Sequence, residues 1–513
     1  MIIIYHKQNK VVEVKHGEEN VVFSGHNIAK TLFELGIKFP GRLIIWCHYD
    51  LKSNLNIAEF PLIFHHNKII ASYNPFEKEY LSNAIGYVEE SPFIKINKKV
   101  SYPTWQMSSN VGGIQTSVLA TFKNQISATN NFDYFLNSLA KLAMPNGVLC
   151  YSEPKLLKDY LGTGKKQSSS NFVLFRFVKQ HYKTRWTFLL FLDLFLYERR
   201  IAFLPLLLSM FYSKRKLKND SIIEGIIVQS KKEVISNGTI DVIIPTIGRK
   251  QYIYDVLKDL SKQTYLPINV VIVEQNPLPE SISELDYISG ENWPFVIKHI
   301  FTHQTGACNA RNLALAEVKS EWVFLNDDDN RFDENLLKDV FSNIKKYGIK
   351  AISTSYLQRN EIKTDIVINQ SSIFGSGNSF IHSDYLPKVT FNKMFEFGYG
   401  EDSDFGMQLR NLGVDIIYFP KLEILHLKAP MGGFRIKPVL EWHKDLIQPK
   451  PSPTIMLYKI LHLSKHQING YKTILFLKFY KAQTIKNPIR YFSSFKKQWK
   501  QSEYWANQLK TKA

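Results

Sequence analysis

The sequence has few cysteines and no long apolar run, and both shortages narrow the class of protein. Of its 513 residues only Cys47, Cys150 and Cys308 are cysteine, and they lie far apart without CxxC spacing. This excludes a disulfide-bonded scaffold and a cysteine-ligated zinc module, and it fits a reducing compartment. No run reaches the roughly 18 uninterrupted apolar residues of a transmembrane helix. The apolar start of the chain is too short for a signal-peptide core, so we expect none.

The chain has enough apolar material for several folded domains. Hydrophobic residues make up 44% of it and aromatic residues 13%, which excludes global disorder. A chain of this length is expected to form two or three domains.

The net charge of +19 is concentrated in two stretches of the chain. Residues 163–220 carry a net +9 and residues 437–513 a net +12, so the rest of the chain is nearly neutral. Both stretches mix Lys and Arg with aromatic and aliphatic side chains. They are either helices packed on the protein with their basic faces in water, or interfacial helices on an anionic membrane.

No nucleic-acid module accompanies the charge, so we expect no nucleic-acid partner. We expect a cytoplasmic protein, held peripherally at the inner face of the cytoplasmic membrane.

The region from residue 239 to 435 alternates buried strands with helices. Strands are expected at 240–246, 269–274 and 321–326, and helices at 252–262 and 306–317. This alternation predicts a Rossmann-like, mostly parallel sheet. Ligands bind such sheets at the carboxyl ends of the strands. Pro245, Thr246, Glu274 and the triplet Asp327–Asp329 all stand at such ends, so we expect them to share one crevice.

Three adjacent aspartates repel one another unless a cation lies among them. Hard oxygen ligands suit Mg²⁺ or Mn²⁺, so the triplet Asp327–Asp329 is a candidate metal site. A solvated acidic turn is the alternative.

A second acidic group opens a predicted helix at residues 405–412. Glu401 and Asp402 follow Gly400, and the helix dipole alone favours acids in a first turn. The next strand is expected at 414–419, ended by Pro420, and a further strand at 422–425 leads to His426. The loop from Gly375 to Asn378 is glycine-rich, which lets backbone approach a ligand closely.

In this order and spacing, the motifs between residues 239 and 435 resemble the family 2 glycosyltransferases of the GT-A fold. The motifs are the strand ending Pro245-Thr246, Glu274, Ala310-Arg311-Asn312, the Asp triplet, the Gly375–Asn378 loop, Glu401-Asp402 and His426. Two positions depart from the family pattern, because Glu274 stands where Asp is usual and Asn326 where a further Asp is common.

The resemblance implies an inverting, metal-dependent transfer of a sugar from a nucleotide-diphosphate sugar, with a UDP-sugar favoured. The acceptor would be a hydroxyl of a glycan or lipid-linked molecule, in surface polysaccharide synthesis. It assigns Asp402 as general base and Glu401 as the residue that orients the acceptor. Its other assignments are Asp327, Asp329 and His426 for Mg²⁺ or Mn²⁺, Pro245, Thr246 and Glu274 for base and ribose, Arg311 and Asp328 for the nucleotide, and Gly377 and Asn378 for the donor sugar.

The first 160 residues repeat the order of features of the catalytic region without its acidic cluster. We therefore expect four segments: an accessory domain at 1–160, a basic helical segment at 161–236, a GT-A catalytic domain at 237–436 and a basic helical segment at 437–513. The accessory domain is either a degenerate GT-A-like copy or an unrelated α/β domain. Whether the chain forms a homo-oligomer is left open by the sequence. The alternative functions are a nucleotidyltransferase on a similar sheet and a non-catalytic nucleotide-sugar-binding scaffold.

Overall fold

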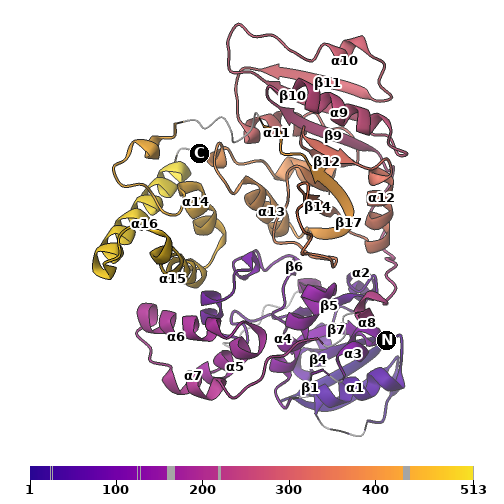
Figure 1. Ribbon diagram of the computed structural model, residues 1–513. Coiled ribbons are helices and arrows are strands. Elements are labelled where there is room, and N and C mark those ends of the chain that lie inside the picture. The colour runs from indigo at the N-terminus through magenta and orange to yellow at the C-terminus, as the bar shows by residue number, and fades with distance from the viewer. Residues whose placement is uncertain are drawn as a thin grey trace. The chain divides into compact units, whose positions relative to one another are not determined.

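The computed structural model describes residues 1–23, 25, 27–123, 125–126, 129–158, 168–217, 221–430 and 439–511. The chain forms two compact units (Figure 1), here called the first and the second unit. The first unit comprises residues 1–232 and 463–477, and the second comprises residues 233–462 and 478–513. The boundaries differ from those expected, because the segment after residue 168 packs within the first unit and the C-terminal segment is divided between both.

The first unit is built on a mixed sheet with strand order β3-β2-β1-β4-β7-β5-β8-β6. Strands β1 and β4 run parallel, β7 is antiparallel to both β4 and β5, and β5 is parallel to β8. Its bounds are β1 (Ile2–Lys7), β2 (Lys10–His16), β3 (Glu19–Asn20), β4 (Leu43–His48), β5 (Ile69–Tyr73), β6 (Tyr102–Pro103), β7 (Val111–Gln115) and β8 (Leu149–Ser152).

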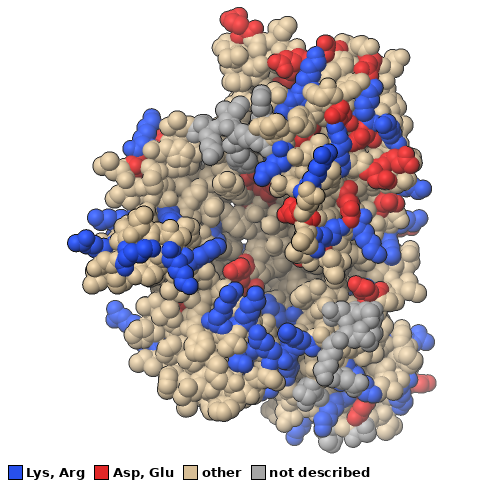
Figure 2. Space-filling view, in the orientation of Figure 1, with Lys and Arg blue, Asp and Glu red and all other residues tan. Residues whose placement is uncertain are grey.

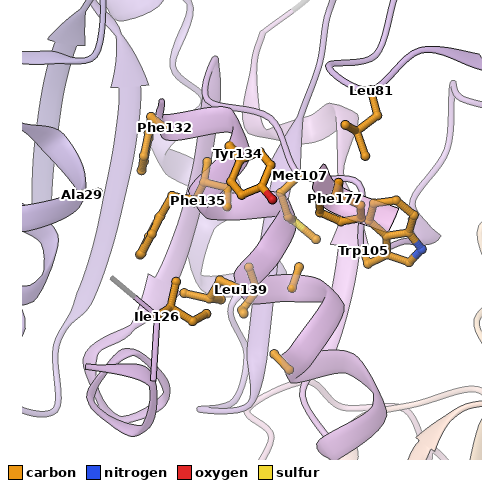
Figure 3. Packing of buried hydrophobic residues seen from close by; sticks show 14 of the residues in the cluster. Ala29, Leu81, Trp105, Met107, Ile126, Phe132, Tyr134, Phe135, Leu139 and Phe177 are labelled. Atoms are coloured by element: carbon orange, nitrogen blue, oxygen red, sulfur yellow. The ribbon is translucent and has the colours of Figure 1, made fainter. Parts of the chain in front are cut away.

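Helices α1 (Ile28–Lys38), α2 (Phe60–Ile63), α3 (Thr116–Phe122) and α4 (Phe132–Ala143) complete the α/β part of this unit. Figure 3 shows part of its core, where aromatic side chains of α4 and α5 gather. The Trp105 and Phe177 rings stack with centroids 5.2 Å apart. Helix α4 begins after Asn131, whose side chain accepts a hydrogen bond from the Tyr134 amide, a favourable N-cap.

The basic segment after residue 168 folds into α5 (Asn171–His181), α6 (Arg185–Glu198), α7 (Phe203–Ser209) and α8 (Ser221–Glu224). Residues 465–477 of α15 (Lys465–Ala482) join them in the first unit. The Gln467 amide donates to the carbonyls of Glu89 (3.0 Å) and Ser91 (2.7 Å). The Thr473 hydroxyl donates to the Asp193 carboxylate at 2.6 Å. A C-terminal helix is thus part of the N-terminal fold.

The second unit has a mixed sheet with strand order β11-β10-β9-β12-β16-β14-β17-β13, and β15 pairs with β17. The strands are β9 (Ile240–Thr246), β10 (Asn269–Gln275), β11 (Val296–Thr302), β12 (Trp322–Asn326), β13 (Asn330–Phe332), β14 (Ala351–Leu357), β15 (Asn369–Gln370), β16 (Asn378–His382) and β17 (Ile417–His426). Its helices are α9 (Lys250–Ser261), α10 (Tyr287–Gly290), α11 (Ala307–Leu315), α12 (Leu336–Tyr347), α13 (Glu401–Asn411), α14 (Pro453–His462) and α16 (Pro488–Thr511). The α/β class predicted from the alternation is confirmed.

One predicted boundary is wrong. Pro420 was expected to end a strand, but β17 continues through it to His426. The pairing of β17 with β14 shifts register between Thr354 and Ser355, so Pro420 lies where the ladder is irregular. Proline is tolerated in a sheet at such a bulge because its missing N–H is not needed there.

The two sheets share a path of five strands. Strands β1, β4, β7, β5 and β8 neighbour one another in the same order and with the same orientations as β9, β12, β16, β14 and β17. Beyond β9 the second unit adds the parallel strands β10 and β11, whereas the first unit adds the antiparallel strands β2 and β3 beyond β1. This arrangement agrees with the degenerate-copy hypothesis, which stays a prediction.

Candidate active site

The Asp triplet lies at the carboxyl end of β12, next to the carboxyl end of its parallel neighbour β9. The Thr246 hydroxyl donates to Asp328 Oδ2 at 2.6 Å. The Arg249 guanidinium lies 2.5 Å from Asp328 Oδ1 and 3.3 Å from Asp329 Oδ2. Burial raises the pKa of Asp328 to about 6, against the opposing effects of Arg249 and Thr246. Two of the three aspartates therefore share one protein cation.

The Asp327 side chain contacts different residues from those that Asp328 and Asp329 contact. Its Oδ1 accepts a hydrogen bond from Arg311 of α11 and its Oδ2 one from the Tyr356 hydroxyl of β14, both at 3.0 Å. A Cβ atom at Gly377 would lie 2.1 Å from Asp327 Oδ2. Only glycine at position 377 lets the loop before β16 approach this carboxylate so closely.

Asp329 pairs with the histidine predicted to work with it. Its Oδ1 lies 3.5 Å from His426 Nε2, and its Oδ2 accepts the Ala429 amide at 2.8 Å. Burial opposes ionisation, but these contacts and Arg249 outweigh it and lower the pKa of Asp329. The Tyr356 and His426 rings stack with centroids 4.6 Å apart, so Tyr356 touches both the Asp327 carboxylate and the imidazole.

The second acidic pair lies in the first turn of α13. Ser376 hydrogen-bonds the Asp402 carboxylate, whose Oδ1 is buried and has no hydrogen-bond partner among the described residues. Burial raises the pKa of Asp402, and Arg311 opposes the rise. Burial, followed by the charge of Asp402, raises the pKa of Glu401 to about 7.

Arg311 connects the two acidic groups electrostatically. It is buried, and although burial disfavours its charge, Asp327, Asp402 and Glu401 together raise its pKa. The same guanidinium opposes the rise in the pKa of Glu401 and of Asp402. Asp327 of the triplet and the acid pair therefore lie around one cation, at the same end of the sheet.

Helix α11 is held in place by a residue that the sequence did not single out. Glu396 accepts the backbone amides of Cys308 (3.0 Å) and Asn309 (2.9 Å), in the first turn of the helix. A Cβ atom at Gly306 would meet this carboxylate at 2.4 Å. Negative charge at a helix N-terminus is stabilising, so Glu396 fixes the element that carries Arg311.

The other predicted residues have mainly local partners. Glu274, at the end of β10, accepts from the Ser283 hydroxyl, the Glu284 amide and His299. Burial opposes its ionisation, but His299 and the other two donors outweigh burial and lower the pKa of Glu274. Pro245 precedes Thr246 in β9 and is half-buried.

Asn378 belongs to the sheet rather than to an open loop. Its side-chain amide donates to the Thr354 carbonyl at 2.7 Å. Just before it, the Gly377 carbonyl accepts the Asn330 amide at 2.7 Å. These contacts fix the backbone of the Gly375–Asn378 loop beside Asp327.

Arg249 and Tyr356 are the two contact residues that the sequence reasoning did not place. Arg249 was visible as a basic residue just after β9, a position where a positive group can face the triplet. Tyr356 had no comparable signal, because β14 becomes a neighbour of β17 only through the strand order of the folded sheet.

Asp327, Asp329 and His426 are the side chains predicted to hold a divalent cation. In the described part of the chain no three His, Cys, Asp or Glu side chains are grouped to hold a metal ion. Mg²⁺ usually takes only one or two protein carboxylates and completes its shell with water and substrate phosphates, at about 2.1 Å per ligand. The 3.5 Å between Asp329 Oδ1 and His426 Nε2 can be bridged by one ion at that range. The residues fit an incomplete shell that a diphosphate would complete.

A separate hollow of about 420 Å³ opens at the opposite end of the sheet, between residues that include Thr239, Ser320 and His382. These residues stand at or before the amino ends of β9 and β12 and at the far end of β16. The hollow is therefore distant from the acidic groups and does not belong to this site.

Residues 241–400 match the family model described as Glycosyl transferase family 2. The resemblance noted in the motifs is confirmed over that range. The chain is 20% identical over 122 residues to Glycosyltransferase GlyG of Streptococcus pneumoniae serotype 4, which covers 24% of this chain and 40% of GlyG. The chain thus matches less than half the length of that relative.

Solved structures give matches of similar extent. TarS of S. aureus is 17% identical and matches 48% of this chain and 44% of its own, with a TM-score of 0.33. The fragment TarS 1–349, crystallised with UDP-GlcNAc, is 18% identical and matches 48% of this chain and 74% of its own, with a TM-score of 0.34. GalNAc-T7 with UDP, GalNAc and Mn²⁺ is 12% identical and matches 37% of this chain and 44% of its own, with a TM-score of 0.32.

Proposed function

We propose that the second unit transfers a sugar from a nucleotide-diphosphate sugar to an acceptor hydroxyl, with inversion at the sugar. The observation that carries the proposal is the position of Arg311, which pairs with Asp327 of the triplet and interacts electrostatically with Glu401 and Asp402. The match of residues 241–400 to the Glycosyl transferase family 2 model supports the same chemistry. The donor class we favour is a UDP-sugar, and the acceptor class is a glycan or a lipid-linked molecule, as in surface polysaccharide synthesis.

The donor would lie at the carboxyl ends of β9, β10 and β12. Thr246 and Pro245, with Glu274, would face the base and ribose, and Arg311 and Asp328 the rest of the nucleotide. Arg249 is committed to Asp328 and Asp329, so in this proposal it holds the triplet rather than activating a phosphate. The loop containing Gly377, next to Asp327, would lie against the donor sugar.

Asp329 and His426, with Asp327, would hold a divalent cation beside the triplet. When bound, Mg²⁺ or Mn²⁺ would neutralise charge on the diphosphate as it leaves. The chain's own cations would also act there, because Arg311 pairs with Asp327 and Arg249 with Asp329.

Proton removal from the acceptor is the task we assign to Asp402. An alcohol is a poor nucleophile until its proton is taken in the transition state. Asp402 Oδ1 is buried and has no hydrogen-bond partner in the part of the chain that the structure describes, and Ser376 hydrogen-bonds the same carboxylate. This fixes the group while leaving one oxygen for the incoming hydroxyl. Glu401, one residue earlier, would orient the acceptor.

The experiment is a comparison of Asp402→Asn with Asp384→Asn. Asp384 is an exposed carboxylate near the far end of β16 and serves as the matched control. We expect Asp402→Asn to lower sugar transfer by about 10²–10⁴-fold, the usual contribution of a general base, while the control transfers normally. Donor binding, followed by thermal shift with nucleoside diphosphates, should survive in both because Asp402 is assigned to the acceptor.

The identity of the released product distinguishes sugar transfer from the main alternative, nucleotidyl transfer. Sugar transfer releases a nucleoside diphosphate, whereas a nucleotidyltransferase releases pyrophosphate. Pyrophosphate release, or full transfer by folded Asp402→Asn, would overturn the assignment. Donor binding without any release would support the scaffold alternative.

A further inference from the structure

The first unit exposes a continuous apolar surface on α6, on α7 and just after α7. Exposed fractions reach 75% at Ile201, 56% at Leu204 and 86% at Phe211. We call this surface the α6–α7 patch. Its members are Phe188, Phe195, Leu196, Ile201, Phe203, Leu204, Leu207, Leu208 and Phe211. Single exposed apolar residues are ordinary on soluble proteins, but a contiguous group marks an interaction site.

The patch is the outer face of well-packed helices. Leu189, Leu190 and Leu194 of α6 and Leu206 of α7 are buried in the core of the unit. The exposed positions from Phe203 to Phe211 recur at the spacing of a single helix face. Both helices therefore have an inner apolar face that holds them on the protein and an outer apolar face that nothing in the described unit covers.

The charge around the patch has one sign. Lys183, Arg185, Arg199, Arg200, Lys214 and Lys216 are all exposed and stand directly before, between and after the two helices. The two acids of this stretch do not oppose them, since Asp193 is buried and Glu198 pairs with Arg200. In Figure 2 the surface over α6 and α7 is mostly tan, and blue Lys and Arg side chains lie beside it.

We propose that the α6–α7 patch inserts into the surface of an anionic lipid bilayer. A bilayer interface accepts apolar side chains below the headgroups and pairs basic side chains with anionic lipid. An aliphatic and aromatic face with a mainly basic rim matches both layers. None of the helices in the described part of the chain has the length and apolar character to span a bilayer, so the contact lies in one leaflet.

The C-terminal basic segment has a different character. The aromatic residues Tyr491, Phe495 and Trp499 of α16 are buried, so this helix packs much of its apolar surface against the protein. The proposal therefore assigns lipid binding to the first of the two basic segments. It does not depend on the sugar-transfer proposal, which concerns the second unit.

The test measures co-sedimentation of the full chain with vesicles. One set of vesicles is phosphatidylcholine alone, and the other is phosphatidylcholine mixed with phosphatidylglycerol. Point substitutions are required, because residues 463–477 are built into the first unit and truncating them would disturb its fold. The test variant is Leu204→Glu with Leu208→Glu, and the control is Ile37→Glu with Leu62→Glu, two exposed apolar residues elsewhere in the same unit.

We expect the native chain to bind the anionic vesicles, with binding weakened by salt, and to bind phosphatidylcholine poorly. The test variant should lose about 100-fold in affinity, since burial of each of its two leucines contributes about tenfold. The control variant should bind like the native chain. Replacing Lys214 and Lys216 with Gln should weaken binding to anionic vesicles only.

Three results would overturn the proposal. The first is no vesicle binding by the native chain, and the second is equal binding by the test variant. The third is a concentration-dependent dimer that Leu204→Glu with Leu208→Glu abolishes while vesicle binding is absent, which would make the patch a contact between protein copies. Circular dichroism of each variant confirms that the helices are intact.

Discussion

Asp193 makes the stability of the first unit depend on pH in an unusual direction. It lies on the inner side of α6 and is fully buried. Its Oδ1 accepts the Thr473 hydroxyl at 2.6 Å, and its Oδ2 has no hydrogen-bond partner among the described residues. Burial raises the pKa of Asp193 to about 7, although the bond from Thr473 lowers it. The carboxyl is therefore protonated in the folded state at pH values where an unfolded chain has lost the proton.

The sign and size of this pH dependence of the free energy of unfolding follow from proton linkage. Between the pKa of an unfolded aspartate, about 3.9, and the folded pKa of about 7, the folded state binds more protons than the unfolded state. The free energy of unfolding contributed by Asp193 is therefore complete at low pH and falls as pH rises through that window. At about 1.4 kcal/mol per pH unit, the fall approaches about 4 kcal/mol by pH 7.

The perturbation is Asp193→Asn, which keeps the shape and removes the titration. We expect the variant to gain stability relative to the native chain as pH rises from 4 to 8, by up to about 4 kcal/mol. Amide hydrogen exchange of β4 and β7, read by mass spectrometry, reports the first unit alone. Glu18→Gln, an exposed carboxylate in the same unit, is the control and should follow the native chain.

A second variant sharpens the result. Thr473→Val removes the hydroxyl that lowers the pKa of Asp193, so the native fall in stability should extend to higher pH. A difference between native chain and Asp193→Asn that stays constant across the pH range would refute the reasoning, because it would show that Asp193 ionises as an ordinary carboxylate.

Three further substitutions test packing at named positions. Gly377→Ala places a methyl group 2.1 Å from Asp327 Oδ2, so it should abolish sugar transfer with little change in the urea midpoint of the second unit. Gly112→Ala places one 2.3 Å from the Trp46 ring and should cost the first unit about 1–3 kcal/mol, read by hydrogen exchange. Glu89→Gln leaves its half-buried partner Lys141 without a counter-ion and should cost about 3 kcal/mol by the same measurement. Unchanged transfer or unchanged exchange would contradict the respective contact.

The sheet of the second unit was predictable because its strands are short runs of buried β-branched residues. Such runs in β9, β10 and β12 leave few alternatives, and the position of the triplet at a strand end follows from them. The long continuation of β17 was not predictable, because Pro420 is a strong strand-ending signal unless a bulge absorbs it. That bulge depends on pairing with β14, which is distant in sequence.

The candidate site was predictable in its acids and less so in its cations. Asp327, Asp329 and Asp402 stand where strand and helix ends place them, and local sequence marks those ends. The bond from Tyr356 to Asp327 arises from tertiary neighbours, and no local pattern reports it. The division of α15 between the two units was hidden for the same reason, since its buried contacts Gln467 and Thr473 are polar residues.

The two units share a sheet topology and also one contact at the start of a helix. In the first unit the Ser109 amide donates to the Asp133 carboxylate at 2.8 Å, at the start of α4. Ser376 and Asp402 make the corresponding contact at the start of α13. The carboxylate at a helix start, held by the loop before an antiparallel strand, therefore belongs to the shared architecture.

What differs lies at the end of the central strand. β12 is followed by three aspartates that two arginines hold, whereas β4 is followed by a single exposed acid, Asp50, paired with Lys7 at 3.0 Å. An exposed ion pair in water contributes little and concentrates no charge. Cations stabilise a diphosphate, and among the described residues only the second unit places arginines against an acidic cluster at the end of its central strand. This difference is the reason why we propose the second unit as the place of the chemistry, although both sheets have an acid at the corresponding helix start.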